Sequence, residues 1–245
     1  MSAFDVNAAD QARRVNVRSL AGRLLFLVND AGFFLSHRLP LALAAKTAGM
    51  EVHIATPADR ASSRIGAHGF VFHPVSMSRS GMNPLREIQS FTAIVRLLRS
   101  VQPDVLHTVA IKPVLYGGLA ARLVRQPAVV SALPGLGSVF TKQGVLAGVA
   151  RRIVGTMYAQ ALRHRHTKVI FQNPDDLRRF VDAKIVTSRD SVLIRGSGVD
   201  LTRFHASPLP AGVPVVLLAS RMIRAKGVEE FVAAAERLRK RNVVA

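Results

Sequence analysis

The chain has 245 residues, 49% of them apolar, which is enough to bury a sizeable core in one large domain or two small ones. It contains no cysteine, which excludes disulfides and thiolate metal sites and favours a reducing compartment. Its 34 Lys and Arg against 15 Asp and Glu give a net charge of +19, which either aids solubility alone or attracts polyanions: nucleic acid, anionic lipid headgroups or phosphorylated substrates.

The N-terminal segment, residues 1–19, mixes acidic and basic residues and has no apolar centre. It therefore lacks the pattern of a signal peptide, and we expect a mobile tail. No apolar run in the chain reaches the roughly 20 residues that cross a bilayer.

Short apolar runs rich in β-branched residues recur from residue 23 onward, separated by stretches with apolar residues at helical spacing. Such alternation predicts a doubly wound α/β fold, a parallel sheet covered by helices on both faces. The expected strands are 23–29, 51–57, 70–75, 104–111, 128–135, 168–173, 191–196 and 214–220. Helices are expected at 39–49 and 85–101, and the first domain at 20–200.

The sequence changes in character after Asp200. Residues 201–214 contain three prolines and no apolar periodicity, which is typical of a linker, and we place the linker at 201–213. A strand at 214–220, a basic loop and a helix from Val228 then start the βα pattern again. Because one strand and one helix cannot bury their own faces, we expect residues 214–245 to be the truncated start of a second Rossmann-like domain.

Ligands of doubly wound sheets collect beyond the carboxyl ends of the strands, so the residues that follow each strand are candidates for the site. Asn29, Lys112 and Ser197 hold such positions. Gly32 lets backbone approach a ligand closely before a helix N-terminus, although an ordinary tight turn uses glycine in the same way. The dinucleotide fingerprint G-x-G-x-x-G is absent, which disfavours a nicotinamide enzyme.

His107 lies in a buried-type run near the expected end of a strand, with Lys112 in the following loop. An imidazole at this position can hold a hydroxyl or polarise a leaving group. The alternative is a core histidine whose nitrogens bond to backbone.

The loop after residue 220 carries Arg221, Arg224 and Lys226, followed by Gly227 and a helix. A guanidinium fork and an ammonium beside a helix N-terminus suit a diphosphate, whereas a solvated basic loop is the plainer reading.

Residues 145–168 interleave cations with apolar residues and contain no acidic residue. A basic amphipathic helix of this kind can lie on an anionic membrane through Arg151, Arg152, Arg163 and Arg165, or it can be a packing helix with a basic outer face. The pair His164 and His166 does not share a helix face, so we expect no metal site there.

Several segments together resemble the retaining glycosyltransferases of family 4, which have the two-Rossmann-domain (GT-B) fold, and in particular bacterial members that assemble capsule, O-antigen and other lipid-linked glycans. The segments occur in the family's order: GFFLSHRLPLALAAKTAGMEVHIATP, PDVLHTVAIKPVLYGGLAAR, GLGSVF, VIFQNPDDLRRF, IRGSGVDLTRF and SRMIRAKGVEEFVAAA.

The resemblance implies that the N-terminal domain binds the acceptor and the C-terminal domain binds a nucleotide-diphosphate sugar, with a UDP-sugar as the expected donor and no metal or other cofactor. Arg221 and Lys226 match the pair that neutralises the donor diphosphate. His107 matches the histidine near the donor sugar, and Gly32 matches the loop near the diphosphate. The expected partners are a polyprenyl-diphosphate-linked or glycan acceptor and the inner, cytoplasmic face of the cell membrane, where the protein would be peripheral.

The family's acidic E-x7-E element would lie beyond Ala245, so we expect these 245 residues not to turn over by themselves. Two alternatives remain. One is a non-catalytic, membrane-docking acceptor half of a split transferase. The other is a nucleic-acid binder, which the absence of Trp and the presence of only two Tyr disfavour.

Overall fold

The computed structural model describes residues 21–77, 83–135, 145–196, 198–202, 204–208 and 211–241, with the backbone alone for 145–151. The chain divides into two units, and the second begins at Val199. Each unit is described by itself. Ser197 and most of the GLGSVF segment lie outside the described residues.

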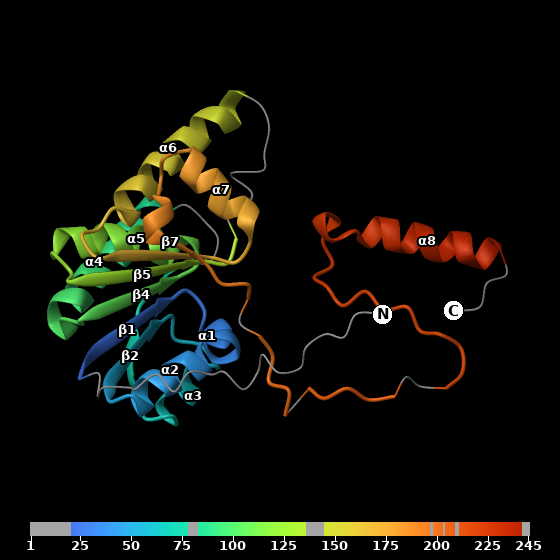
Figure 1. Cartoon of the computed structure of the whole chain (residues 1–245), viewed down its shortest axis with the longest axis horizontal. Coiled ribbons are helices and arrows are strands. Elements are labelled where there is room, and N and C mark those ends of the chain that lie inside the picture. Colours follow the sequence, from blue (N-terminus) through green and yellow to red (C-terminus); the bar gives the residue numbers. More distant parts are fainter. Residues whose placement is uncertain are drawn as a thin grey trace. The chain divides into compact units, whose positions relative to one another are not determined.

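The first unit is built on a seven-stranded parallel sheet with the order β3-β2-β1-β4-β5-β6-β7 (Figure 1). The strands are β1 Gly22–Val28, β2 Met50–Thr56, β3 Val71–Pro74, β4 Val105–Val109, β5 Ala128–Leu133, β6 Thr167–Phe171 and β7 Ser191–Leu193. They confirm the seven strands expected between residues 23 and 196. The order reverses between β1 and β4, which is the point where doubly wound sheets bind their ligands.

Helices connect the strands and cover both faces of the sheet. They are α1 Ala31–His37, α2 Leu39–Thr47, α3 Ser63–Gly66, α4 Pro84–Val101, α5 Ile111–Leu123, α6 Val145–Leu162 and α7 Pro174–Asp182. Figure 1 shows α1, α2 and α3 together on one side of β1 and β2.

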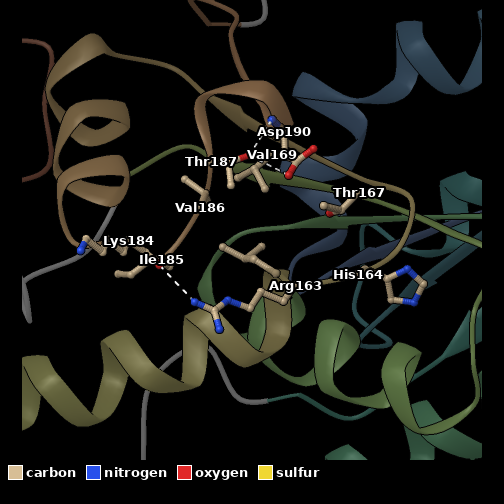
Figure 2. Close-up of a pocket in the computed structure, with 10 residues that line it drawn as sticks. Arg163, His164, Thr167, Val169, Lys184, Ile185, Val186, Thr187 and Asp190 are labelled. Carbon is tan, nitrogen blue, oxygen red and sulfur yellow. Dashed lines mark hydrogen bonds between the residues drawn. The ribbon is translucent and has the colours of Figure 1, made fainter.

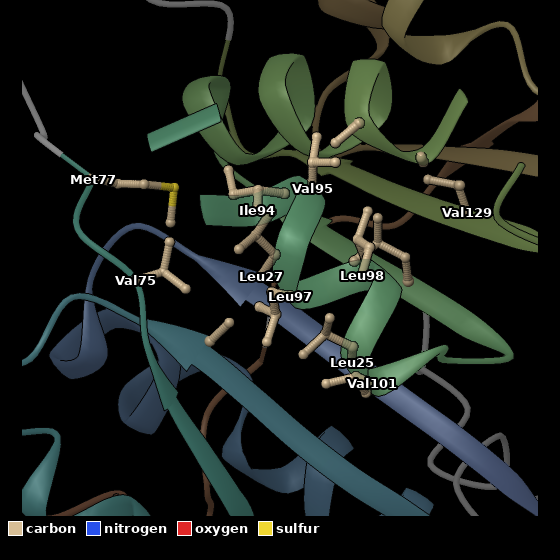
Figure 3. Packing of buried hydrophobic residues seen from close by; sticks show 14 residues of the cluster. Leu25, Leu27, Val75, Met77, Ile94, Val95, Leu97, Leu98, Val101 and Val129 are labelled. Atoms are coloured by element: carbon tan, nitrogen blue, oxygen red, sulfur yellow. The ribbon is translucent and has the colours of Figure 1, made fainter. Parts of the chain in front are cut away.

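The pleat of each strand sends alternate side chains to opposite faces, so β1 contributes to two cores. Leu25 and Leu27 pack against α4, where Ile94 and Leu98 are buried (Figure 3). Phe26 faces the other way and packs with Phe34 of α1. Both faces of the central strand are therefore dry, which explains its unbroken apolar sequence.

Helices α5 and α6 approach each other closely at Gly118. A Cβ at this residue would lie 2.3 Å from the backbone oxygen of Ala161. Below this contact, Tyr158 and Phe180 pack edge to face in a third core cluster. The absence of a side chain at residue 118 thus allows the close approach of α6 to α5.

Two local expectations were wrong. Residues 31–37 form helix α1, where only a turn was expected, because the Asp30 side chain accepts the backbone N–H of Phe33 and starts a helix directly after β1. Residues 214–220 form no strand, and Val215 is 88% exposed. A strand needs a neighbour to receive its backbone hydrogen bonds, and this run has none in the part of the second unit that is described. The expected helix is confirmed as α8, Val228–Lys240.

Candidate active site

The carboxyl ends of β1 and β4 meet at the point where the strand order reverses. Asn29 follows β1 and is half-buried. Gly32 does not lie in an open loop as expected. It is the second residue of α1, and a Cβ there would lie 3.3 Å from the Asp30 carboxylate that caps the helix. Asn29 and Gly32 therefore flank the start of α1 at this edge.

His107 lies within β4, opposite Phe26 of β1, with two strand residues after it. Its side chain is 4% exposed and meets the Phe26 ring edge-on at 5.1 Å. Nδ1 lies 3.1 Å from the Val130 carbonyl oxygen and donates to it, while Nε2 is buried without a hydrogen-bond partner. A core histidine with both nitrogens bonded to backbone therefore explains Nδ1 but does not explain the unbonded Nε2.

Burial, followed by the nearby charge of Arg38, lowers the pKa of His107 to about 4. The imidazole is therefore neutral at pH 7. Because Nδ1 carries the proton that bonds to Val130, Nε2 presents a lone pair, and the group can accept a hydrogen bond from a ligand hydroxyl.

Arg38 was not predicted as a site residue. It joins α1 to α2, and its half-buried side chain makes no hydrogen bond or ion pair within the described parts of the chain. Burial lowers its pKa, but a guanidinium stays charged at any physiological pH. A half-buried, unpaired guanidinium beside an unpaired imidazole nitrogen is suited to an anionic ligand that also carries a hydroxyl. The available sequence signal was a single cation within the apolar run FFLSHRLPLAL.

The chain turns from β4 into α5 through Ala110, whose φ of 79° lies in the region that favours glycine. No side chain caps α5. Lys112, in the first turn of α5, places its Nζ 2.7 Å from Oε1 of Glu87 on α4. The Tyr116 hydroxyl donates to Oε2 of the same carboxylate at 2.6 Å. Lys112 is thus at the expected edge, but its charge is engaged by a carboxylate from another helix.

The second unit holds the expected phosphate-binding pair. Arg221 precedes the 3₁₀ turn Arg224–Lys226, and both Arg221 and Lys226 are exposed. Gly227 then takes a left-handed φ of 73° and starts α8, and Arg224 lies 3.5 Å from Glu229 in its first turn. The local geometry leaves both cations of the pair accessible.

The four arginines expected on one basic helix face do not share a helix. Arg152 is exposed on α6 beside Ile153, which is 58% exposed, whereas α6 ends at Leu162. Arg163 and Arg165 therefore lie in the loop between α6 and β6 and cannot belong to the helix face. The side chain of Arg151 lies outside the described residues. A shallow apolar depression of about 350 Å³ lies beside Ile153, between α5 and α6.

No group of three or more His, Asp or Glu residues in the described ranges is arranged to hold a metal ion. Within the same ranges, no helix has the length and apolar character needed to cross a membrane.

Residues 23–173 match the family described as glycosyl transferase 4-like. The N,N'-diacetylbacillosaminyl-diphospho-undecaprenol alpha-1,3-N-acetylgalactosaminyltransferase of Campylobacter jejuni is 24% identical over 230 residues, which are 89% of this chain and 61% of that protein. The UDP-N-acetylglucosamine--N-acetylmuramyl-(pentapeptide) pyrophosphoryl-undecaprenol N-acetylglucosamine transferase of Paracidovorax citrulli is 30% identical over 148 residues, 57% of this chain and 41% of that protein. The chain thus spans less than two thirds of either relative.

Two solved structures share the fold at low sequence identity. A glycosyltransferase from Rickettsia africae has a TM-score of 0.58 and 15% identity, covering 90% of this chain and 58% of that one. Sucrose-phosphate synthase from Thermosynechococcus elongatus has a TM-score of 0.59 and 15% identity, covering 88% and 60% respectively.

Proposed function

Because this chain belongs to the glycosyl transferase 4-like family, we propose that it takes part in moving a sugar, with retention and without a metal, from a nucleotide-diphosphate sugar to a lipid-linked diphosphate acceptor. The Campylobacter and Paracidovorax relatives both act, by their names, on undecaprenol-linked diphosphates. The observation that carries the proposal is the pair of unsatisfied buried groups on His107 and Arg38.

We assign these two groups to substrate binding. The lone pair on His107 Nε2 accepts a hydrogen bond from a sugar hydroxyl and so fixes the orientation of the reacting ring. The Arg38 guanidinium binds a phosphate oxygen of the acceptor. This oxygen supplies the hydrogen bonds that water would give to a fully exposed guanidinium. Asn29 and Gly32, at the start of α1, are candidates to contact the same ligand, and Ser197 stays a prediction.

In the transfer step the bond between the anomeric carbon and the nucleotide diphosphate breaks, and an acceptor hydroxyl forms the new glycosidic bond. The hydroxyl proton passes to the departing diphosphate. Arg221 and Lys226 neutralise the negative charge that develops on this leaving group, which lowers the barrier because the stabilisation grows toward the transition state. A UDP-sugar is the proposed donor.

An acceptor with a polyprenyl chain stays in the membrane, so the protein has to reach it there. Exposed Arg152 and Ile153 on α6 combine a cation with an apolar side chain, as interfacial helices do. We therefore propose a peripheral position on the inner face of the cell membrane, for synthesis of a cell-surface glycan.

The proposal is tested by two measurements on the chain: binding of an undecaprenyl-diphosphate-linked monosaccharide in detergent micelles, and transfer of a radiolabelled sugar from UDP-sugars. We expect saturable acceptor binding that Arg38→Gln weakens about tenfold or more, and Arg38→Lys weakens less because it keeps the charge. Arg99→Gln, on the exposed side of α4, is the control and should bind as the natural chain does.

Equal acceptor affinity of Arg38→Gln and Arg99→Gln would show that Arg38 does not bind the acceptor. No acceptor binding by the natural chain would refute the proposal. Acceptor binding with transfer supports the complete reaction. Acceptor binding without transfer supports the alternative, an acceptor half that works with a donor-binding chain.

A further inference from the structure

The edge of the sheet opposite the candidate active site is hollowed and basic. There β5 and β6 begin, and α5 and α6 end. Three adjoining cavities of about 330, 510 and 690 Å³ share lining residues: Arg163 and His164 line the first and second, and Arg165 and His166 line the second and third. We call these three neighbouring cavities together the amino-edge basin.

The charge of the basin is strongly one-sided. Its three cavities are lined by one carboxylate, Asp190, and by seven cations: Arg122, Arg125, Arg163, Arg165, Lys168, Lys184 and Arg189. The Asp190 carboxylate accepts a hydrogen bond from Thr187, so even this group is partly engaged locally. Like charges gathered in a concave surface focus a positive potential that draws anions.

The fold uses some of these cations. Arg122 donates to the backbone oxygens of Gln160 and Arg163, at 3.0 and 3.3 Å, at the end of α6. Arg163 donates to the Lys184 carbonyl oxygen, as Figure 2 shows, and Lys168 donates to the carbonyl oxygen of Arg189. These bonds satisfy carbonyl groups that secondary structure leaves open.

Three guanidinium groups have no such use. The side chains of Arg125, Arg165 and Arg189 make no hydrogen bond or ion pair with any residue that the structure describes. Arg165 lines both of the larger cavities, with Arg125 in one and Arg189 in the other. All three residues are exposed, so their guanidinium groups are accessible to an anion that enters the hollow.

One uncharged group in the basin is also unsatisfied. Thr167 Oγ1 is buried without a hydrogen-bond partner, and Thr167 lines the cavity in Figure 2. A buried hydroxyl without a partner costs free energy, so a ligand oxygen that accepts its proton would gain binding energy there. The unpaired Thr167 hydroxyl therefore points to a ligand independently of the charge.

The lining selects among anions. None of the three cavities is lined by a Phe, Tyr or Trp ring, the larger rings on which bases stack, which disfavours single-stranded nucleic acid. A concave cationic hollow fits a compact group better than it fits a flat membrane surface, and guanidinium forks match the oxygens of phosphate. We propose that the amino-edge basin binds a compact phosphorylated anion carrying one or two phosphoryl groups, at a site separate from the carboxyl edge.

Titration with pyrophosphate at constant ionic strength tests the site directly, with isothermal calorimetry as the readout. We expect saturable binding that Arg125→Gln/Arg165→Gln weakens about tenfold or more. Arg96→Gln/Arg99→Gln removes the same charge from the exposed side of α4 and should change the affinity less than about twofold. Equal losses in the two double variants would mean that net charge alone attracts the anion, and would overturn the proposal.

Thr167→Val gives a second test that does not alter charge. Because the Thr167 hydroxyl is buried and unpaired, its removal should leave the fold at least as stable while pyrophosphate binds about three- to tenfold more weakly. Full affinity in this variant would contradict a ligand at Thr167.

Arg221→Gln/Lys226→Gln separates the basin from the donor site of the proposed function. Pyrophosphate binding should persist in this variant, and its loss there rather than in the basin variants would refute the basin while supporting the donor site.

Competition with phosphatidylglycerol vesicles identifies the source of the phosphate. Vesicle binding that pyrophosphate abolishes assigns a lipid headgroup, and vesicle binding that persists assigns a soluble anion.

Discussion

The Glu87 carboxylate contacts Lys112 and Tyr116 and so ties α4 to α5 at the candidate active site. Oε1 lies 2.7 Å from Lys112 Nζ, Oε2 lies 2.6 Å from the Tyr116 hydroxyl, and the Lys112 and Glu87 side chains are only 16% and 18% exposed. We therefore expect Glu87→Gln to destabilise the first unit although it preserves size and shape.

The size of the expected loss in unfolding free energy follows from the burial of Glu87 and Lys112. A hydrogen bond to a charged group contributes about 1.5–3 kcal/mol net, and the Gln amide oxygen still accepts from Tyr116, so Glu87→Gln should lose about 1–2 kcal/mol. For a chain of this length that lowers Tm by roughly 2–8 °C. Lys112→Met should cost a similar amount, and the double variant should cost less than the sum by about 1 kcal/mol, because the interaction that the two residues share is lost only once.

The chain supplies its own probe for this unit, because it has no tryptophan and its two tyrosines are Tyr116 and Tyr158. Urea unfolding followed by tyrosine circular dichroism in the near ultraviolet thus reports the first unit. Asp175→Asn removes one partner of an exposed ion pair on α7 and serves as the control, with an expected change below about 0.5 kcal/mol. Additivity of the Glu87 and Lys112 changes within about 0.3 kcal/mol would refute the reasoning.

Three further outcomes are expected. Gly118→Ala should destabilise the first unit by about 1–3 kcal/mol because its Cβ would lie 2.3 Å from a backbone oxygen. Gly155→Ala, whose Cβ would have its nearest atom at 3.6 Å, should instead stabilise α6 by about 0.5–1 kcal/mol. Chemical unfolding of the two variants compares these changes. The pKa of His107 is lowered from 6.5 to about 4, so its contribution to stability is full above pH 6.5 and is lost as the pH falls toward 4. In His107→Gln, the free energy of unfolding should depend less steeply on pH between 4 and 6.5, by up to about 1.4 kcal/mol per pH unit. Burial, then the Glu87 hydrogen bond and charge, raise the pKa of Tyr116 to about 12. The contribution of Tyr116 to stability is therefore present below pH 10 and is lost as the pH rises through 12. In Glu87→Gln, absorbance at alkaline pH should show one phenol ionising at lower pH.

The sheet could be predicted because both faces of a buried parallel strand are apolar, as in Leu24–Val28, and because helical spacing marks α4. Helix α1 was missed because it depends on one capping contact, from the Phe33 amide to Asp30. The run at 214–220 has a strand's composition, but composition cannot supply the neighbouring strand that hydrogen bonds require.

The site was predicted in part for a similar reason. Position after a strand places Asn29 and Lys112 at the carboxyl edge, and this follows from topology alone. The pairing of Lys112 with Glu87, 25 residues away, and the proximity of Arg38 to His107 depend on how helices pack across the sheet. No local pattern encodes such contacts, and the end of α6 at Leu162 likewise separates arginines that are close in sequence.

The exposed run at 214–220 also affects how the protein behaves at high concentration. Val215 and Leu217 are 88% and 80% exposed in a segment without charge, which is the composition of strands that pair between molecules. At low ionic strength the net charge of +19 keeps the molecules apart, but salt shortens the reach of that repulsion to about 10 Å at 0.1 M. The chain should therefore stay dispersed in dilute buffer and aggregate reversibly as salt is added, and a charged substitution at Val216 should raise the salt concentration at which light scattering first increases.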